Sequence, residues 1–355
     1  MKPYIIPIFI NNEGCPNRCV FCNERITAGD YSGDITRDTF RKRVDALLPR
    51  PDDPRPVEIA FYGGNFTGIP PHRQEELLCY AADYMGWGII NTIRISTRPD
   101  YIDEKTVERL VRFGVSTVEL GAQSMDDAVL SKARRGHSAR DTTAAVNLLK
   151  KYSLITGIHL MAGLPGDTEE GFYASVDAVI RLAPDTVRIH PTIILRDTPL
   201  ADLYQRGMYT PLTMEQATTL CMEALRRFHR AYIPVIRLGL QITGEMEREG
   251  NIVAGPFHPS FGFIVMSTLF RETAAALLSL GSAGKTEALF SLHARDVSAF
   301  RGLRNGNISA LKERFPLSRI TVRENLTQKR HTVALIGADG GIESNIFAYH
   351  MTERT

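Results

Sequence analysis

Three cysteines lie close together near the start of the chain, at Cys15, Cys19 and Cys22, in the spacing C-x3-C-x2-C. Thiolates are soft ligands that suit iron–sulfur clusters and zinc, and three of them on one loop can hold three corners of a cubane and leave one iron open. A structural zinc site is the alternative, but it needs four ligands. Cys79 and Cys221 fall in helix-like segments, and we interpret both as small buried hydrophobic residues rather than as ligands.

The elements that must position these cysteines follow from the hydrophobic pattern. The first two-thirds of the chain alternates short β-branched runs with longer amphipathic segments, which is typical of βα units around a parallel sheet. We predict six strands and a seventh candidate, at Tyr4–Ile10, Val57–Tyr62, Thr92–Ser96, Ser116–Gly121, Ile155–Met161, Thr186–Pro191 and Val235–Gln241. We predict helices over Thr36–Leu48, Glu75–Met85, Ala139–Lys151, Glu169–Leu182 and Met214–His229. Because six units use roughly the first 195 residues and a closed eightfold barrel takes about 250, we expect an α/β fold with an open, partial (β/α)6 barrel.

The pattern changes after about Leu240. A long apolar helix is expected around His258–Leu280, and residues 288–336 have the pattern strand, helix, strand, strand. From Gly281 to Thr355 there are 11 Lys and Arg against 7 Asp and Glu, so this is the basic part of the chain. We therefore expect a partial barrel over residues 1–245, a helical connection over 246–282, and a small basic α/β domain over 283–355.

Composition limits the class of protein. With 43% hydrophobic and 23% charged residues the chain is globular, and a formal net charge of +2 argues against a surface that binds polyanions everywhere. The longest apolar run, Phe261–Phe270, stops at Arg271 and is too short to cross a bilayer. The first ten residues lack the pattern of an export signal. We expect a cytoplasmic protein without membrane attachment.

The three cysteines directly after a first strand resemble the radical S-adenosylmethionine (SAM) superfamily. The resemblance implies that Cys15, Cys19 and Cys22 hold a 4Fe-4S cluster and that SAM chelates the open iron. It also implies reductive cleavage of SAM to a 5′-deoxyadenosyl radical, which abstracts hydrogen from a substrate. Such an enzyme needs an electron donor of the flavodoxin or ferredoxin type.

Residues at the ends of the next strands extend the resemblance. Gly63, Gly64 and Asn65 follow the second strand, where the superfamily turns its backbone toward the amino group of SAM, and glycine permits that close approach. Ser96 ends the third strand and is expected near SAM.

In relatives, the positions matching Gln123 and Arg135 bind the ribose hydroxyls and the SAM carboxylate, tasks that suit an amide and a guanidinium. His159 precedes the GLPG loop, where the superfamily packs adenine. Two interpretations of His159 stay open: contact with the adenosyl group, or a core imidazole beneath the loop.

The strings STRPDYID, ELGAQSMDD, RRGH and HLMAGLPGD resemble the radical SAM domain of the Elongator catalytic subunit family, over about residues 5–245. That family acts on the wobble uridine of transfer RNA (tRNA) and couples this domain to an acetyltransferase. After residue 245 the sequence shows no acetyltransferase-like stretch, and the family's additional zinc-type cysteines are absent. Oxygen-independent coproporphyrinogen oxidases share two landmarks, but they carry a tyrosine at the position of Phe9 and a carboxylate at that of His159.

The basic tail offers a candidate RNA contact. A glycine-rich basic turn before a helix can clamp a nucleic-acid backbone, and here Arg301, Arg304 and Lys312 surround such a turn. A solvated basic helix face is the alternative. Our hypothesis is a radical SAM enzyme that modifies RNA of the tRNA type. The alternatives are a radical SAM enzyme with a small-molecule substrate, and a non-catalytic iron–sulfur sensor that binds RNA.

Overall fold

The computed structural model describes residues 3–10, 13–16, 18–29, 35–240, 243–281, 286–337 and 340–348. The chain divides into two compact units. The first contains residues 1–217 and 233–257, and the second contains residues 218–232 and 258–355. Each unit is described by itself.

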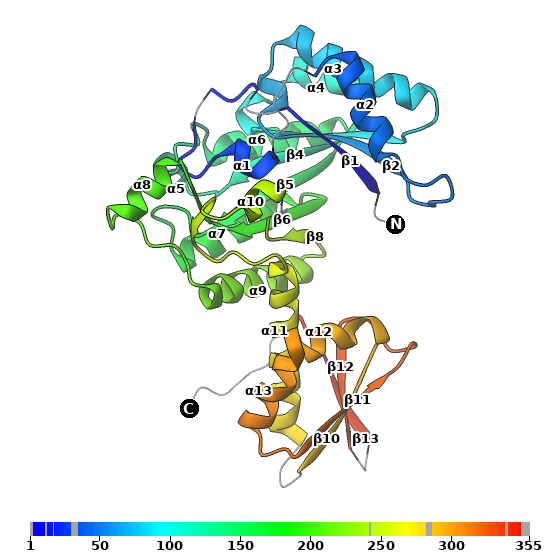
Figure 1. The fold of residues 1–355 in the computed structure, drawn as a ribbon, viewed down its shortest axis with the longest axis vertical. Helices are drawn as coiled ribbons and strands as arrows, with labels where there is room; N and C mark the ends of the chain where they lie inside the picture. Colours follow the sequence, from blue (N-terminus) through cyan, green and yellow to red (C-terminus); the bar gives the residue numbers. More distant parts are fainter. Residues whose placement is uncertain are drawn as a thin grey trace. The chain divides into compact units, whose positions relative to one another are not determined.

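The first unit is built on a seven-stranded sheet in the order β1-β2-β3-β4-β5-β6-β8, in which all neighbours are parallel (Figure 1). The first and last strands of this order lie at opposite ends, so the curled sheet is an open half-barrel. This confirms the predicted partial barrel, and the seventh candidate strand is part of the sheet. The strands are β1 (Tyr4–Phe9), β2 (Val57–Tyr62), β3 (Thr92–Thr97), β4 (Val115–Gln123), β5 (Ile155–Ala162), β6 (Thr186–Pro191) and β8 (Val235–Leu238).

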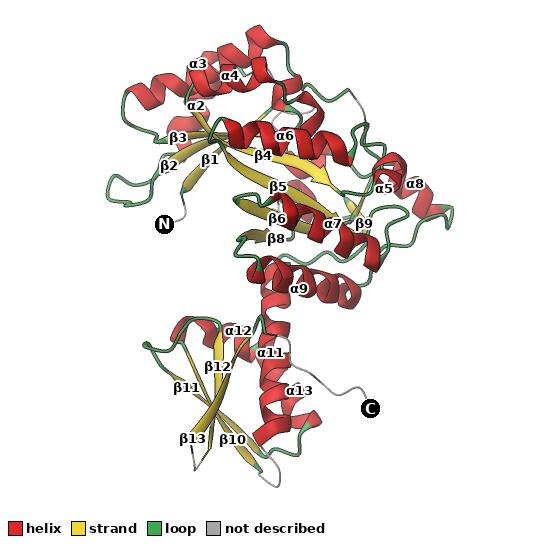
Figure 2. Ribbon diagram, turned by 180° about the vertical axis from the view of Figure 1, so that it is seen from behind, coloured by secondary structure: helices red, strands yellow, loops and turns green. Residues whose placement is uncertain are grey.

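Figure 2 shows α6 and α7 on the outer face of this sheet, among the helices of the first unit. The helices of this unit are α1 (Glu24–Ala28), α2 (Arg37–Leu47), α3 (Pro71–Gly86), α4 (Glu104–Arg112), α5 (Asp127–Lys132), α6 (Ala139–Lys151), α7 (Glu169–Leu182), α8 (Pro199–Gln205) and α10 (Gly244–Glu247), with short 3-10 turns η1 (Phe66–Gly68) and η2 (Pro99–Tyr101). A separate antiparallel pair joins β7 (Ile194–Leu195) to β9 (Ile252–Ala254).

Side-chain caps fix where several of these helices begin. The Ser138 hydroxyl accepts a hydrogen bond from the backbone N–H of Asp141, whose carboxylate in turn accepts from the backbone N–H of Ser138, and this capping box starts α6. Thr168 caps α7, because its hydroxyl accepts a hydrogen bond from the backbone N–H of Gly171. These caps satisfy backbone donors that have no partner inside the helix, so the helix start is set locally by sequence.

The second unit contains a four-stranded mixed sheet in the order β11-β10-β12-β13. Its strands are β10 (Glu287–Leu292), β11 (Arg319–Glu324), β12 (Thr332–Gly337) and β13 (Gly340–Asn345). Its helical elements are α11 (Phe261–Gly281), α12 (Val297–Arg301), α13 (Gly306–Arg314), η3 (Ala294–Asp296) and η4 (Leu303–Asn305), together with most of α9 (Met214–Arg230).

Helix α11 is longer than the apolar run recognised in the sequence. It continues past Arg271 to Gly281, so by length and composition it is a candidate membrane span, which corrects the expectation of an apolar run too short to cross a bilayer. Half of its most apolar stretch is buried, and it contacts α12, α13, β12 and β13. The core helix of a soluble domain has the same properties, because apolar residues on several faces pack against neighbouring elements.

Candidate active site

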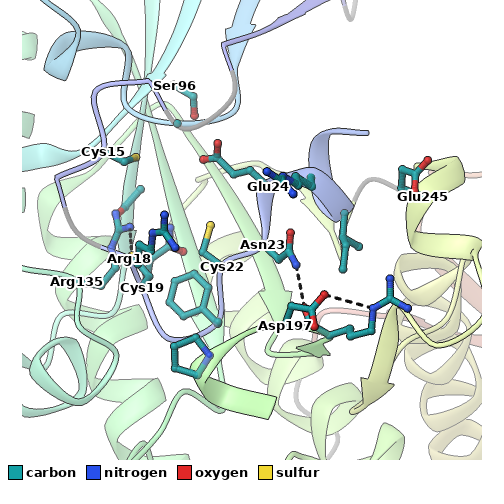
Figure 3. A pocket seen from close by; sticks show the side chains of 18 of the residues that line it. Cys15, Arg18, Cys19, Cys22, Asn23, Glu24, Ser96, Arg135, Asp197 and Glu245 are labelled. Atoms are coloured by element: carbon teal, nitrogen blue, oxygen red, sulfur yellow. Dashed lines mark hydrogen bonds and ion pairs between the residues drawn. The ribbon is translucent and has the colours of Figure 1, made fainter. Parts of the chain in front are cut away.

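The three clustered cysteines share one cavity at the carboxyl edge of the sheet. Cys15, Cys19 and Cys22 lie on the segment between β1 and α1 and line a cavity of about 1240 Å³. Figure 3 shows them along one curve of the chain, with Arg135 beside Cys19 and with Asn23 and Glu24 following at the start of α1. The structure therefore places all three thiols on the wall of one cavity, although the described residues contain no group of three His, Cys, Asp or Glu side chains close enough to hold a single metal ion.

The cysteine segment is tied to the sheet by Asn65. Its side-chain N–H donates to the carbonyl of Gly14 at 2.8 Å, and its side-chain oxygen accepts from the Thr97 hydroxyl at 2.6 Å and from the backbone N–H of Arg98 at 3.0 Å. Gly14 has a φ of 74°, and a Cβ there would lie 2.2 Å from the Asn65 carbonyl oxygen. Glycine is therefore required where the segment passes so close to the sheet.

These bonds revise the sequence interpretation of Asn65. Its amide is fully buried and committed to protein partners, and neither Asn65 nor Gly63 lines the cavity. The adjacent Gly64 does line it. We therefore interpret Asn65 as a residue that positions the cysteine segment, because both polar atoms of its side chain have protein partners.

The other predicted SAM contacts line the same cavity as the cysteines: Gly64, Ser96, Gln123, Arg135 and His159. Two of them carry buried polar atoms without a partner among the described residues, the side-chain oxygen of Gln123 and Nε of Arg135. A buried polar atom without a partner costs free energy unless a ligand or water satisfies it. Three thiols and these unsatisfied atoms in one cavity fit a cluster with a polar small molecule beside it.

Arg135 joins the cysteine segment to the fourth strand. One guanidinium nitrogen, Nη1, donates to Sγ of Cys19 at 3.1 Å, and Nη2 donates to the carbonyl of Gly121 at 2.6 Å. A positive charge beside a sulfur stabilises its thiolate form. The geometry therefore places Arg135 against a predicted cluster ligand, and its Nε has no partner among the described residues.

Two of the three thiols have a raised pKa. Burial, followed by the charges of Glu24 and Cys19, raises the pKa of Cys15 to about 11. Desolvation by the surrounding protein, followed by the charges of Glu24 and Cys19, also raises the pKa of Cys22, although solvent reaches its side chain in the cavity. Thiols must lose their protons to bind a metal, so cluster binding is coupled to proton release.

A network of buried charges lies on the inner face of the half-barrel, next to the cavity. Arg94 bonds Glu58 and Glu119, each at 2.6 Å. Glu119 also contacts Arg188 at 2.7 Å and Nε2 of His159 at 3.2 Å. Burial alone would raise the pKa of Glu119, but the bond from His159 and the charges of His159, Arg188 and Arg94 lower it to about 2. His159 therefore has a partner inside the barrel and also faces the cavity.

Sequence reasoning missed part of the cavity wall. Arg98 is nearly fully buried there, pairs with Asp100 at 2.8 Å, and has a guanidinium nitrogen without a partner among the described residues. Its signal was its place directly after the third strand. Residues from segments far along the chain, in and around α8 and α10, complete the wall: Arg196, Asp197, Pro199, Glu245, Arg248 and Asn251. No sequence spacing connects these to the cysteines.

The remaining predicted residues lie elsewhere. Cys221 is buried as expected, but Cys79 is exposed on α3, so the interpretation of Cys79 as a buried hydrophobic residue was wrong. Arg301 ends α12 and Arg304 lies in η4, and both are exposed. Lys312 is exposed on α13, and its ammonium donates to the carbonyl of Ser318 at 2.8 Å. These three residues belong to the second unit, outside the cavity.

The fold and the site define a half-barrel protein in which three cysteines of one loop share a cavity with polar groups from the strand ends. Comparison with known families gives the class. The family model described as the radical SAM superfamily matches residues 12–179, and the model of the radical SAM C-terminal domain matches residues 184–271. The chain belongs to the radical SAM superfamily, whose members are enzymes that use a 4Fe-4S cluster and SAM.

Relatives narrow the resemblance. A tRNA uridine(34) acetyltransferase of Dehalococcoides mccartyi is 37% identical over 233 residues, covering 56% of this chain and 50% of the relative. Another of the same name, from Methanocaldococcus jannaschii, is 25% identical over 254 residues, covering 60% of this chain and 47% of the relative. The chain thus spans about half the length of these relatives. The solved structure of archaeal Methanocaldococcus infernus Elp3 with an N-terminal deletion matches with a TM-score of 0.59 at 22% identity, covering 77% of this chain and 64% of that one, which supports the fold.

Proposed function

We propose that this radical SAM enzyme modifies RNA and that its substrate is a tRNA or a tRNA-like stem–loop. The observation that carries the radical chemistry is the single cavity shared by Cys15, Cys19 and Cys22 with unsatisfied polar groups. The RNA substrate is supported by the two relatives named tRNA uridine(34) acetyltransferase, which match this chain over more than half of its length.

In this proposal Cys15, Cys19 and Cys22 hold the 4Fe-4S cluster. When bound, the cluster supplies the electron for reductive cleavage of SAM, which is the chemistry that the superfamily uses. Gly64, which lines the cavity, brings backbone close to the ligand. The neighbouring cavity residue Ser96 offers a hydroxyl.

Gln123 and Arg135 orient SAM through the atoms that protein groups leave unsatisfied. The Gln123 side-chain oxygen can accept from a ribose hydroxyl, and Nε of Arg135 can donate to a carboxylate. Arg98 provides a second donor on the same wall. Arg135 has a further task, because its bond to Cys19 holds that sulfur in position.

Partners and location follow from this chemistry. The enzyme requires a one-electron donor of the flavodoxin or ferredoxin type, and it acts in the cytoplasm, where tRNA and reducing carriers occur. The RNA backbone is contacted by three exposed basic residues of the second unit, Arg301, Arg304 and Lys312.

The test is a comparison of modified nucleosides in tRNA from cells with and without this chain. We expect at least one modified nucleoside to disappear on deletion and to return with wild-type chain or with Cys79→Ala, whose cysteine lies outside the cavity. Cys19→Ala should not restore it. An unchanged nucleoside profile, together with SAM cleavage by the purified protein, would contradict RNA as the substrate and favour a small molecule.

A further inference from the structure

A row of three basic side chains crosses the inner face of the half-barrel on neighbouring strands. In the parallel pairing, His159 of β5 is opposite Arg188 of β6, and Arg188 is opposite Arg237 of β8. Paired residues of adjacent parallel strands project from the same face of a sheet. Arg188 points into the barrel, where it bonds Glu119 and Tyr62, so Arg237 projects into the same space.

The carboxylates on this face are already committed. Both oxygens of Glu119 have partners, Oε1 with Arg94 and Arg188 and Oε2 with His159. Glu58 is paired with Arg94. The side chain of Arg237 has no hydrogen bond or ion pair with any described residue, although it is partly buried.

Two like charges in register on adjacent strands repel each other. Burial, and then the charge of Arg188, lower the pKa of Arg237, which is the direction expected for a cation that lacks a counter-ion. The nearby polar atoms point to the same deficiency: Nε of Arg188 and Nδ1 of His190, on the same strand and face, are buried without a described partner. An anion between them would satisfy all three groups.

We propose that Arg188, His190 and Arg237 form an anion-binding subsite that receives a carboxylate or phosphate group of the substrate. Guanidinium groups bind both anions through paired N–H donors. The row begins at His159, which lines the cysteine cavity, whereas Arg188, His190 and Arg237 follow on β6 and on the edge strand β8 and do not line it. The subsite therefore lies beside that cavity. The subsite stands whether the substrate is an RNA or a small molecule.

Thermal unfolding of the full-length chain tests this subsite without requiring enzyme activity. The melting temperature is measured in sodium phosphate, sodium acetate and sodium chloride at equal ionic strength. An anion at 100 times its dissociation constant should raise the melting temperature of the wild type by about 5 °C over chloride. The anion that gives the larger shift identifies the group as phosphoryl or carboxylate.

Arg237→Gln is the decisive variant. It should lose the anion-dependent shift, and in chloride it should melt at or above the wild-type temperature because the repulsion with Arg188 is removed. Arg140→Gln, which changes an exposed arginine of α6, should keep the wild-type shift. The proposal is overturned if neither anion shifts the wild type, if Arg237→Gln retains the shift, or if that variant melts several degrees lower in chloride, which would mark Arg237 as a structural residue.

Discussion

Glu119 is the residue on which the charges of the half-barrel interior converge. It is fully buried and accepts from Arg94, Arg188 and His159, which come from three different strands. The sequence shows each of these residues in an inward position of a strand, but it cannot show which inward residues face each other. That information requires the register of β3 to β6, so sequence analysis identified His159 and missed Glu119.

Removing the charge of Glu119 should destabilise the protein strongly. Glu119→Gln leaves Arg188 buried without its carboxylate, and breaking a buried ion pair from one side costs about 3–5 kcal/mol. Chemical denaturation at pH 7 measures the loss. Glu104→Gln is the matched control, because its ion pair with Lys151 is exposed and solvent screens such a pair, so its loss should change stability little. Equal losses for both variants would contradict the network.

The same carboxylate gives a pH dependence with a defined sign. The pKa of Glu119 is about 2 in the folded chain against an ordinary value of 4.5, so the folded state holds fewer protons on this group. The contribution of Glu119 to the free energy of unfolding is fully present above pH 4.5 and is lost as the pH falls toward 2. The difference in unfolding free energy between wild type and Glu119→Gln should therefore narrow over this range. A difference that is constant with pH would show that Glu119 acts through packing alone.

At the scale of elements, local sequence signals predicted most of the first unit. The bounds of β2, β6, α6 and α7 agree with the predicted ranges, because buried β-branched runs and helix caps act locally. In the second unit the predicted order strand, helix, strand, strand omitted α12 and β13. α12 is a five-residue helix, and β13 is a glycine-rich strand that forms by pairing with β12, so neither has a strong pattern of its own.

The connection between the cysteine segment and the sheet can be tested at Asn65. Asn65→Ala removes the bond to Gly14 and leaves buried groups of Thr97 and Arg98 unsatisfied, at a cost of about 1–3 kcal/mol. We expect the variant to lose a reconstituted cluster to an iron chelator faster than the wild type does. The decrease in visible absorbance measures this rate. Asn91→Ala is the control, because Asn91 makes a similar bond to the backbone of Val57 at the opposite end of the sheet. Similar chelation rates for the two variants would contradict a positioning role for Asn65.

At the scale of the whole molecule, charge is distributed unevenly. The second unit contains 15 Lys and Arg against 9 Asp and Glu, although the whole chain carries a formal net charge of only +2. The sequence located this basic region, and the structure adds the arginines of α9 to its unit. Local composition is therefore more informative about a nucleic-acid partner than total charge.

If the second unit contacts tRNA, binding should weaken with salt in proportion to the phosphates contacted. Replacing Arg301 and Arg304 by serine should lower affinity and reduce the steepness of the slope of log K against log salt by about 1.4–1.8, since each lost contact removes about 0.7–0.9. Filter binding over a salt series measures this slope. A double serine variant of the exposed arginines Arg140 and Arg206, in the first unit, should leave it unchanged. Equal slopes for all three proteins would exclude Arg301 and Arg304 as phosphate contacts.

The measurement that bears most directly on the whole account is iron and sulfide analysis of anaerobically reconstituted protein, combined with SAM cleavage under dithionite. Wild type and Cys79→Ala should each contain about four irons and four sulfides per chain and should release 5′-deoxyadenosine. Cys19→Ala should lose both the cluster absorbance and the product. Zinc in place of iron, or full cleavage activity in Cys19→Ala, would contradict the central claim that the three cysteines of this loop hold the cluster.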